Sequence, residues 1–367
     1  MLGLPYALAQ GGFIGGMLVL LVGAFFAYLS AQYIGILFYL DGRNVPISSI
    51  IELRIGKVFG FLVLAGTMFS AYGAMVAYPL AIGELLYSLA NIPFGIGSLG
   101  FLIVLIAILS RDLGDSSNIN TVVTSILVIL LIWVIAKAFP HIEPLNLLSF
   151  HPTNMPFAVG VVIFAFSGHL VIPSVLHYVG ADISTGLKVI NWGLGSVALL
   201  YALFFLITLG VVGGKVTSVA TVALGQSLSP AVAIVGQVFT IMAIFTSAFG
   251  VGISLKLIFE NQFRLKPFYS LALIAIPVVL IDVYLSLASG DVFVQVLNYA
   301  GGIGSALYAG FVPAVAALSL SRFYKLPYGT YGAYAAVIFY GLAIFLTVFS
   351  KNQYACSEYN IAMIKKE

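Results

Sequence analysis

Long apolar segments recur along almost the whole sequence, and the short stretches between them carry most of the charged residues. A helix that crosses a bilayer needs about 20 predominantly apolar residues, because it rises about 1.5 Å per residue through about 30 Å of hydrocarbon. This length predicts one partial segment, over about 1–10, and ten further segments. The ten lie near 13–39, 58–89, 97–110, 119–138, 155–179, 187–213, 229–258, 267–287, 293–320 and 329–349. The sequence therefore predicts an all-α polytopic membrane protein.

The composition excludes a water-soluble fold. Of the 367 residues, 62% are hydrophobic and 7% are charged, whereas a soluble domain carries about a quarter charged residues. We assign 1–350 to one membrane domain and 351–367 to a C-terminal tail, which holds the single cysteine, Cys356. The net charge of +3 is spread over the loops and gives no sign of a nucleic-acid partner. A multi-pass protein embedded in a prokaryotic cell membrane is expected.

The basic residues predict how the chain faces the two sides of the bilayer. If successive segments alternate in direction, ten Lys and Arg residues fall on one side and only Lys137 and Lys215 on the other. Lys and Arg are retained on the cytoplasmic side, so the first side is predicted to be cytoplasmic. The side of the tail, with Lys351, Lys365 and Lys366, stays open. The ten residues are Arg43, Arg54, Lys57, Arg111, Lys188, Lys256, Arg264, Lys266, Arg322 and Lys325.

Two segments carry residues that interrupt a helix. The first interruption is Gly3-Leu4-Pro5, and the second is Phe166-Ser167-Gly168-His169, followed by Ile172-Pro173. They lie in the first and sixth segments, where two inverted five-helix halves would each place their first helix. Interrupted helices offer free backbone groups to a ligand inside the membrane. The alternative is that Gly and Pro mark only kinks or close packing.

His169 is the only histidine predicted at membrane depth. An imidazole is costly there unless it faces a cavity or a partner, so it is a candidate for the binding site. The alternative is a structural tie to a neighbouring helix. Ser167 and His169 do not indicate a hydrolase, because residues two apart on a helix do not face each other. No convergent nucleophile and base or cluster of metal ligands indicates an enzyme.

Short motifs in four segments resemble those of the amino acid/auxin permease family, a branch of the amino acid/polyamine/organocation superfamily. The likeness runs over nearly the whole chain. The resemblance implies an inverted-repeat fold of five plus five helices with one extra helix, and uptake of amino acids coupled to a cation gradient by alternating access. The motifs are Leu2-Gly3-Leu4-Pro5-Tyr6-Ala7, Tyr72-Gly73 with Ala77-Tyr78 and Gly83-Glu84, Phe164-Ala165-Phe166-Ser167-Gly168-His169, and Thr246-Ser247 with Phe249-Gly250-Val251.

The resemblance also implies where the amino acid binds. In the family, backbone groups at the unwound parts of helices one and six hold the α-carboxylate and α-amino groups. Tyr72 and Tyr78 are candidates for the wall of the side-chain pocket, and at six residues apart only one of them is expected to line it. Carried over to this sequence, the substrate-binding residues are Gly3, Leu4, Tyr72, Tyr78, Phe166, Ser167, Gly168 and His169.

The coupling ion is expected to be sodium or a proton, and no other cofactor is expected. In sodium-coupled relatives a cation binds helix-one carbonyls and a hydroxyl pair of helix eight. Thr246 and Ser247, with the carbonyl of Ala243, occupy the matching positions, and oxygen ligands suit a hard cation. The alternative is that both hydroxyls bond back to their own helix. Some proton-coupled relatives use a lysine within helix five, where Lys137 lies only at the outer end, so sodium is favoured.

The chain begins inside the helix-one motif. The family's Gly-x-Gly pair and the half-helix before it are not in this sequence, so the resemblance implies a truncated first helix. Poor transport by the polypeptide as written is expected. Uptake with and without a restored upstream half-helix tests this expectation, and equal rates would contradict it.

A few further polar residues fall inside the segments. Asp282 lies towards the outer end of its segment, where a structural role facing a wet vestibule or a role in proton coupling is expected. Glu84 matches an acidic position of the family and is expected to tie helices or to gate. The expected role in the tenth helix is close packing, by Asn298, Gly301, Gly302 and Gly304.

The leading hypothesis is a secondary active transporter of amino acids. Neutral amino acids are expected because no buried charge pair awaits a charged side chain. The abundance of aromatic residues reflects lipid-facing positions and does not indicate an aromatic substrate. The alternative is a non-transporting amino-acid sensor on the same fold. The sequence gives no signal for an oligomeric state.

Overall fold

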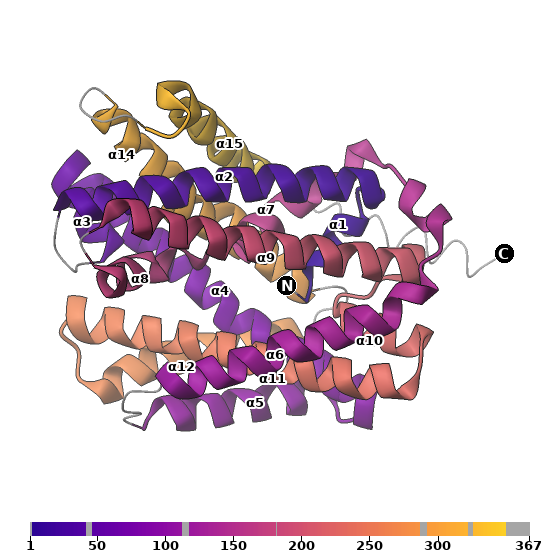
Figure 1. Cartoon of the computed structure of the whole chain (residues 1–367). Coiled ribbons are helices and arrows are strands. Elements are labelled where there is room, and N and C mark those ends of the chain that lie inside the picture. The colour runs from indigo at the N-terminus through magenta and orange to yellow at the C-terminus, as the bar shows by residue number, and fades with distance from the viewer. Residues whose placement is uncertain are drawn as a thin grey trace.

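The structure is a computed structural model that describes residues 2–41, 46–111, 117–180, 182–286, 292–321 and 326–349. The described residues form helices and connecting turns, and no strand occurs among them. Eight of the described helices are long, and in Figure 1 most of them run roughly parallel to one another, whereas α4 and α15 run obliquely. The eight are α2 (Gly12–Asp41), α4 (Lys57–Ala90), α5 (Phe94–Leu109), α6 (Ser117–Ala138), α9 (Ile183–Val212), α11 (Pro230–Leu257), α12 (Pro267–Ser286) and α15 (Gly329–Phe349).

Two further membrane-crossing segments are composite. One consists of α7 (Pro156–Ala165), the 3-10 turn η4 (Gly168–Val171) and α8 (Ile172–Val179). The other consists of α13 (Val292–Tyr299), the π-helix η7 (Ala300–Phe311) and α14 (Val312–Leu320). In the described part of the chain, nine segments are long and apolar enough to cross a membrane, and α5 is a shorter apolar helix. These ten coincide with the ten predicted segments, which confirms the all-α polytopic membrane fold.

The sequence reasoning missed two short helices between the spans. They are α3 (Ile47–Ile55) and α10 (Ala220–Ser227). Both are too short to register in a search for spans of about 20 residues. Helix α3 buries Ile47, Ile50 and Ile51 and packs on α4 at the end of the bundle. The opening segment forms α1 (Leu4–Ala9), with short connecting turns elsewhere at Phe139–His141, Pro144–Leu148, Pro152–Asn154, Gly213–Lys215 and, as the π-helix η6, Ile258–Gln262.

Figure 1 shows two groups of helices. Helices α2, α8, α9 and α15 lie in the upper half of the view, and α5, α6, α11 and α12 lie in the lower half. Helix α4 runs obliquely between the groups and packs on η7, α5, α11 and α12. This arrangement places the interrupted segment α7–η4–α8 on one side of α4 and α11 on the other.

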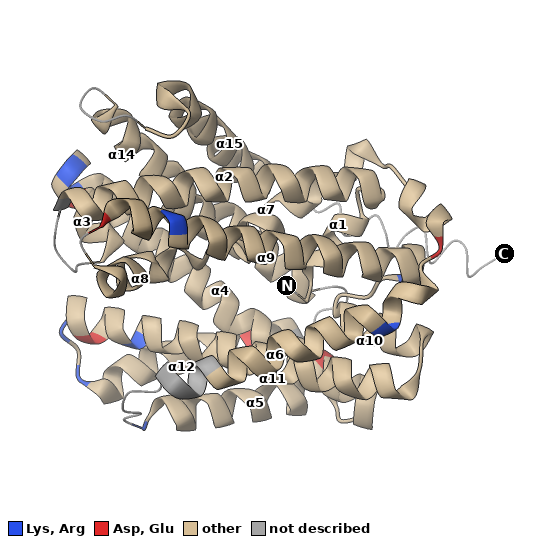
Figure 2. Ribbon diagram, viewed as in Figure 1, with Lys and Arg blue, Asp and Glu red and all other residues tan. Residues whose placement is uncertain are grey.

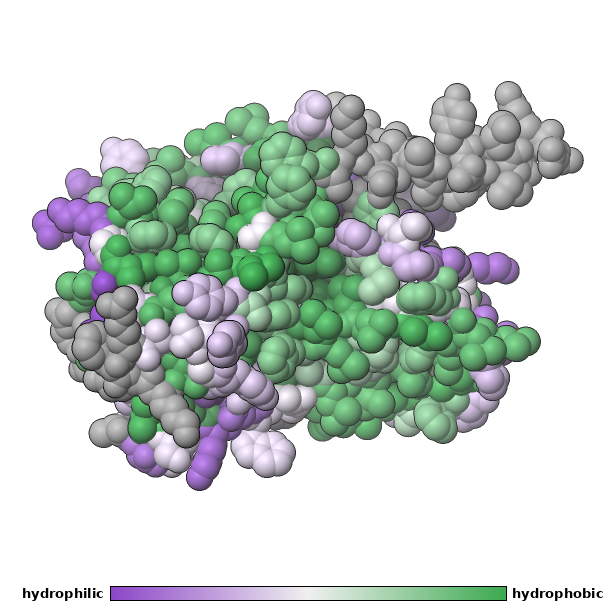
Figure 3. Space-filling model, turned by 90° about the horizontal axis from the view of Figure 1, so that it is seen from above, coloured by the Kyte–Doolittle hydropathy of each residue, from purple (hydrophilic) through white to green (hydrophobic). Residues whose placement is uncertain are grey.

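The surface and the charges fit a bilayer. The side chains of Ile103, Ile129 and Ile338 are 69%, 65% and 68% exposed. Exposure of such large apolar side chains is unfavourable in water and favourable in lipid. Hydrophobic residues cover much of the face in Figure 3. Most Lys and Arg residues gather at the left end of the bundle in Figure 2. In the described residues that end holds Arg54, Lys57, Arg111, Lys188, Lys256, Arg264 and Lys266, against Lys137 and Lys215 at the other.

Three residues of the predicted charge split lie outside the described residues, namely Arg43, Arg322 and Lys325. The tail, with Cys356 and the lysines at 351, 365 and 366, also lies outside them.

Glycines of η7 pack against three neighbouring helices. A Cβ atom at Gly301 would lie 1.9 Å from the carbonyl oxygen of Gly160 on α7, and one at Gly304 would lie 2.6 Å from the backbone nitrogen of Ser70 on α4. On the α15 side, a Cβ at Gly302 would collide with the hydroxyl of Thr347. The close packing predicted for this helix is therefore confirmed, and it fixes η7 beside the interrupted segment.

Candidate functional site

The second predicted interruption is present in the structure. Helix α7 ends at Ala165 and α8 begins at Ile172, with the turn η4 between them. The hydroxyl of Ser167 donates to the carbonyl oxygen of Phe164 at 2.6 Å and so competes with the helix for that acceptor. Pro173 has no N–H for the carbonyl oxygen of His169, which accepts a 3-10 bond from Ile172 instead. The local sequence thus explains the break.

Tyrosine hydroxyls replace the helical donors at the break. Tyr201 on α9 donates to the carbonyl oxygen of Ala165 at 3.0 Å. Tyr308 on η7 donates to the carbonyl oxygen of Ser167 at 2.6 Å. In a continuous α-helix both carbonyls would accept from N–H groups four residues later. The phenols of Tyr201, which is half-buried, and Tyr308, which is buried, therefore bond backbone oxygens at the break.

Tyr78 on α4 belongs to the same cluster. Its side chain is hydrogen-bonded to that of Ser247 on α11, and Tyr201 and Tyr308 are neighbours of its phenol. The ring of Phe166 lies 5.3 Å from that of Tyr201. Aromatic side chains from α4, α9 and η7 thus surround the break.

Sequence reasoning missed Tyr201 and Tyr308. A usable signal was present, because both lie inside spanning helices and away from the interfacial positions that tyrosine favours in membranes. A buried phenol normally finds a hydrogen-bond partner, so a tyrosine in the middle of a span indicates a polar partner there.

His169 connects the break to two other helices. Its imidazole is 2% exposed, and its Nε2 atom lies 2.9 Å from Oγ of Ser30 and 3.2 Å from the carbonyl oxygen of Ala27, both on α2. Oγ of Ser30 lies 3.2 Å from the hydroxyl of Tyr340 on α15. These contacts favour the structural tie. Gly168, next to it, is exposed, and a Cβ there would meet open space.

The first predicted interruption opens α1. Gly3 is the N-cap residue, and a Cβ there would lie 3.1 Å from the ring of Phe293 and 3.3 Å from Val294 on α13. Leu4 is buried, and α1 packs on α2, α7 and α9. Gly3 thus lies against α13, and α1 as a whole packs beside α7, the helix that leads into the break.

Tyr72 is separated from this cluster. Its hydroxyl donates to the carbonyl oxygen of Leu273 on α12 at 2.8 Å. Of the two candidate wall residues on α4, Tyr78 faces the break and Tyr72 faces α12.

The two hydroxyls of the candidate cation site have different partners. The hydroxyl of Thr246 lies 2.9 and 3.1 Å from the carbonyl oxygens of Met242 and Ala243 on its own helix, whereas Ser247 bonds to Tyr78. Their oxygens, with the Ala243 carbonyl, are donors of the kind that sodium accepts. A sodium site here stays a prediction. Among the described residues no group of three His, Cys, Asp or Glu side chains is placed to hold a metal ion.

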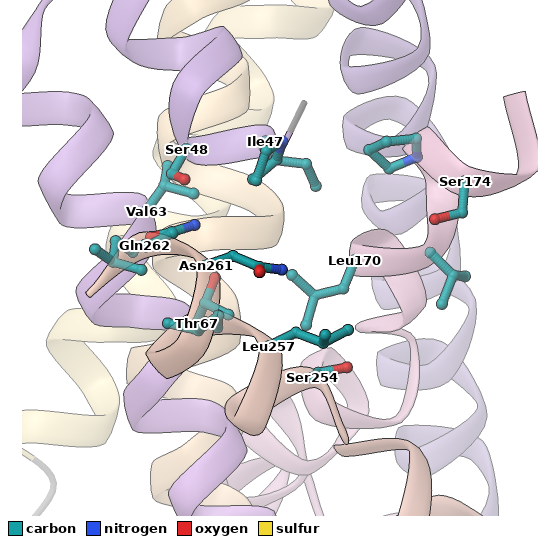
Figure 4. A pocket seen from close by; sticks show the side chains of 15 residues that line it. Ile47, Ser48, Val63, Thr67, Leu170, Ser174, Ser254, Leu257, Asn261 and Gln262 are labelled. Carbon is teal, nitrogen blue, oxygen red and sulfur yellow. The ribbon is translucent and has the colours of Figure 1, made fainter. Parts of the chain in front are cut away.

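A cavity of about 490 Å³ lies at the basic end of the bundle, between α3, α4, α8, α11 and η6 (Figure 4). Asn261 and Leu257 lie opposite Leu170 and Ser174 of the interrupted segment. Leu170 and Val171 of the lining belong to η4, the turn that begins at the exposed Gly168. None of the described residues that line the cavity is charged. The cavity therefore extends from the basic end to the turn of the break.

The two predicted acidic residues are both hydrogen-bonded to serines. The carboxylate of Asp282 accepts from Ser98 on α5 at 2.7 Å and is fully buried between α5 and α12, so it does not face a wet vestibule. Glu84 accepts from the hydroxyl of Ser218, which precedes α10. Glu84 therefore ties α4 to the α9–α10 connection, as the sequence predicts.

The chain has no significant match among individually curated proteins. A family model of the tryptophan/tyrosine permeases, by contrast, matches residues 1–350. This match keeps the wider prediction of an amino acid permease and corrects the narrower one of an amino acid/auxin permease. The motifs behind the narrower prediction lie at helix interruptions and packing positions, which reflect a general transport architecture more than one family. The chain belongs to the tryptophan/tyrosine permease family.

Proposed function

We propose that the protein carries tryptophan, tyrosine or a similar neutral aromatic amino acid across the membrane, coupled to a sodium or proton gradient by alternating access. Membership of the tryptophan/tyrosine permease family supports an aromatic substrate and a transporter rather than an enzyme. The observation that carries the proposal is the break between α7 and α8, which opens backbone groups in mid-segment beside a cavity.

The break is the proposed substrate site. Phe166, Ser167 and Gly168 supply its backbone, Gly3 and Leu4 approach it through α1, and Tyr78 forms part of its aromatic wall. The exposed backbone at Gly168 is available to the polar end of an amino acid. A ring fits among aromatic side chains by stacked or edge-to-face contact. His169 holds the shape of the break through Ser30.

The cavity is the proposed path between the break and the basic side. Its uncharged lining combines apolar side chains with the amides of Asn261 and Gln262. This mixture suits a zwitterion with an aromatic ring, because neither end of the solute meets an unpaired buried charge. By the positive-inside rule the basic side is cytoplasmic, so this conformation faces the cytoplasm.

Either cation is compatible with the described contacts. Ala243, Thr246 and Ser247 are the candidate ligands for sodium, and Asp282 is the candidate carrier of a proton. The two ions predict different results when the gradients are imposed separately.

Uptake by proteoliposomes tests the proposal. Labelled tryptophan and tyrosine are expected to accumulate when a sodium or a pH gradient is imposed, and leucine is expected to accumulate less. Collapse of the gradient with an ionophore is the control. Saturable binding without accumulation under either gradient would favour the amino-acid sensor, and the absence of both would remove the proposal.

A further inference from the structure

Two tyrosine hydroxyls from two elements bond the backbone at the break. Those of Tyr201 and Tyr308 donate to the carbonyl oxygens of Ala165 and Ser167. Carbonyl oxygens of an interrupted helix are the groups that membrane transporters offer to a ligand. In this structure two of these oxygens are already bonded by the protein's own donors.

The two oxygens lie among aromatic side chains. Tyr308 is 2% exposed and Phe166 is 3% exposed, and the ring of Phe166 packs against that of Tyr201. At 2.6 and 3.0 Å the phenols occupy the hydrogen-bonding side of the carbonyls that faces α9 and η7. The Ser167 oxygen also accepts the first 3-10 hydrogen bond of η4, so both of its lone pairs are in use and a ligand donor there takes the place of the Tyr308 hydroxyl.

An ammonium group is the donor best able to make this exchange. It carries three N–H donors and a full charge, and a charge-assisted hydrogen bond is about twice as strong as one between neutral groups. A carboxylate has no donor and cannot replace a hydroxyl on a carbonyl oxygen. The exchange therefore distinguishes ligands with an amino group from ligands without one.

We infer that the hydroxyls of Tyr201 and Tyr308 compete with the α-ammonium group of the substrate for the carbonyl oxygens of Ala165 and Ser167. The inference rests on the proposed function and assigns two specificity-determining residues to the same site. The hydroxyls stabilise the closed arrangement of the break, and the charged amino group of an aromatic amino acid displaces them. A ligand that lacks the amino group leaves them in place.

Binding to the purified full chain in lipid nanodiscs tests the inference with the variant Tyr308→Phe. Three ligands share an indole ring: tryptophan and tryptamine carry an ammonium group, and indole-3-propionate carries only a carboxylate. The phenyl ring of the variant has no hydroxyl to compete for the Ser167 carbonyl, so the affinity for tryptophan and tryptamine is expected to rise roughly two- to ten-fold, the net effect of one hydrogen bond. The affinity for indole-3-propionate is expected to stay unchanged.

Tyr39→Phe is the matched control. Its hydroxyl also bonds a backbone carbonyl oxygen, that of Gly180 at 3.1 Å, but at the end of α2. The Tyr39→Phe variant is expected to bind all three ligands with unchanged affinity. Tyr201→Phe makes the same test at Ala165, and it decides the matter if Tyr308→Phe does not fold.

Two outcomes would overturn the inference. One is an equal change for all three ligands, which would mean a structural role for the hydroxyl. The other is an unchanged or weaker affinity for tryptophan and tryptamine. Irreversibly misfolded protein lowers the number of binding sites and not the dissociation constant, and any residual equilibrium between folded and unfolded protein changes all three affinities by the same factor. If the unsubstituted protein binds no aromatic amino acid, the proposed function itself fails, which is a separate result.

Discussion

The Nε2 atom of His169 lies 2.9 Å from the Oγ atom of Ser30, and Oγ of Ser30 lies 3.2 Å from the hydroxyl of Tyr340. One small hydroxyl on α2 thus joins the turn at the helix break to α15. All three side chains are buried. In the membrane interior no water replaces a lost partner, so this serine has more effect on stability than its size suggests.

The variant Ser30→Ala is expected to destabilise the protein by about 1–3 kcal/mol, the usual cost of leaving a buried polar group unpaired. Thermal unfolding in detergent measures the change. Ser319→Ala is the control, because that hydroxyl bonds only within its own helix, to the carbonyl oxygen of Ala316 at 2.6 Å. Equal melting temperatures for Ser30→Ala and the unsubstituted protein would show that the contact does not hold the break.

Substitutions at two glycines are expected to separate folding from binding. Ala at Gly168 meets open space, so the protein is expected to fold, whereas Leu at Gly168 fills the exposed side of the break and is expected to abolish uptake without loss of folded protein. Ala at Gly301 collides with the Gly160 carbonyl oxygen at 1.9 Å and is expected to prevent close packing. Size-exclusion profiles and uptake of labelled tryptophan measure both effects. A monodisperse Gly301→Ala variant would contradict the packing argument.

The lengths of the apolar segments and the charges of the loops predicted the spans. Both depend only on local composition, because the thickness of the bilayer fixes the length of a span and Lys and Arg residues stay on the cytoplasmic side. The break at 166–169 was also predictable, since Gly168 and Pro173 act on their own backbone. The partners of the break were not. In the sequence, Tyr201 and Tyr308 are 36 and 141 residues away from the residues whose carbonyls they bond. Helical periodicity predicts contacts only between residues a few positions apart, so it could not predict these pairs.

The choice between Tyr72 and Tyr78 shows the same limit. The spacing indicates that they face different ways, but only the packing of α4 on α12 and of α4 beside the break shows which of them faces the cluster. The buried Asp282 was misjudged for a related reason, because its partner Ser98 lies 184 residues away on α5.

The cap of α9 predicts a dependence of stability on pH. Asp182 accepts hydrogen bonds from the side chain of Thr185 and from the backbone N–H groups of Ser184 and Thr185, and these bonds lower the pKa of its carboxyl below the ordinary 3.8. The stabilisation is therefore complete above pH 3.8 and is lost as the pH falls through the lower pKa of the folded protein. The melting temperature of Asp182→Ala is expected to lie below that of the unsubstituted protein at pH 7 and to approach it in acid. A gap that persists in acid would contradict this.

The cavity at the basic end predicts one-sided access to the substrate path. In a Cys356→Ser background, a cysteine introduced at Ser254 lies on the cavity wall, whereas one at the fully buried Ser98 lies between α5 and α12. A membrane-impermeant maleimide is expected to label Ser254→Cys in inside-out vesicles but not in right-side-out vesicles, because the positive-inside rule predicts that the basic end is cytoplasmic. Ser98→Cys is expected to stay unlabelled in both. Saturating tryptophan is expected to slow the labelling of Ser254→Cys, since substrate in the path shields the thiol. Labelling from the outer side alone would reverse the assigned orientation, and labelling that tryptophan leaves unaffected would separate this cavity from the path.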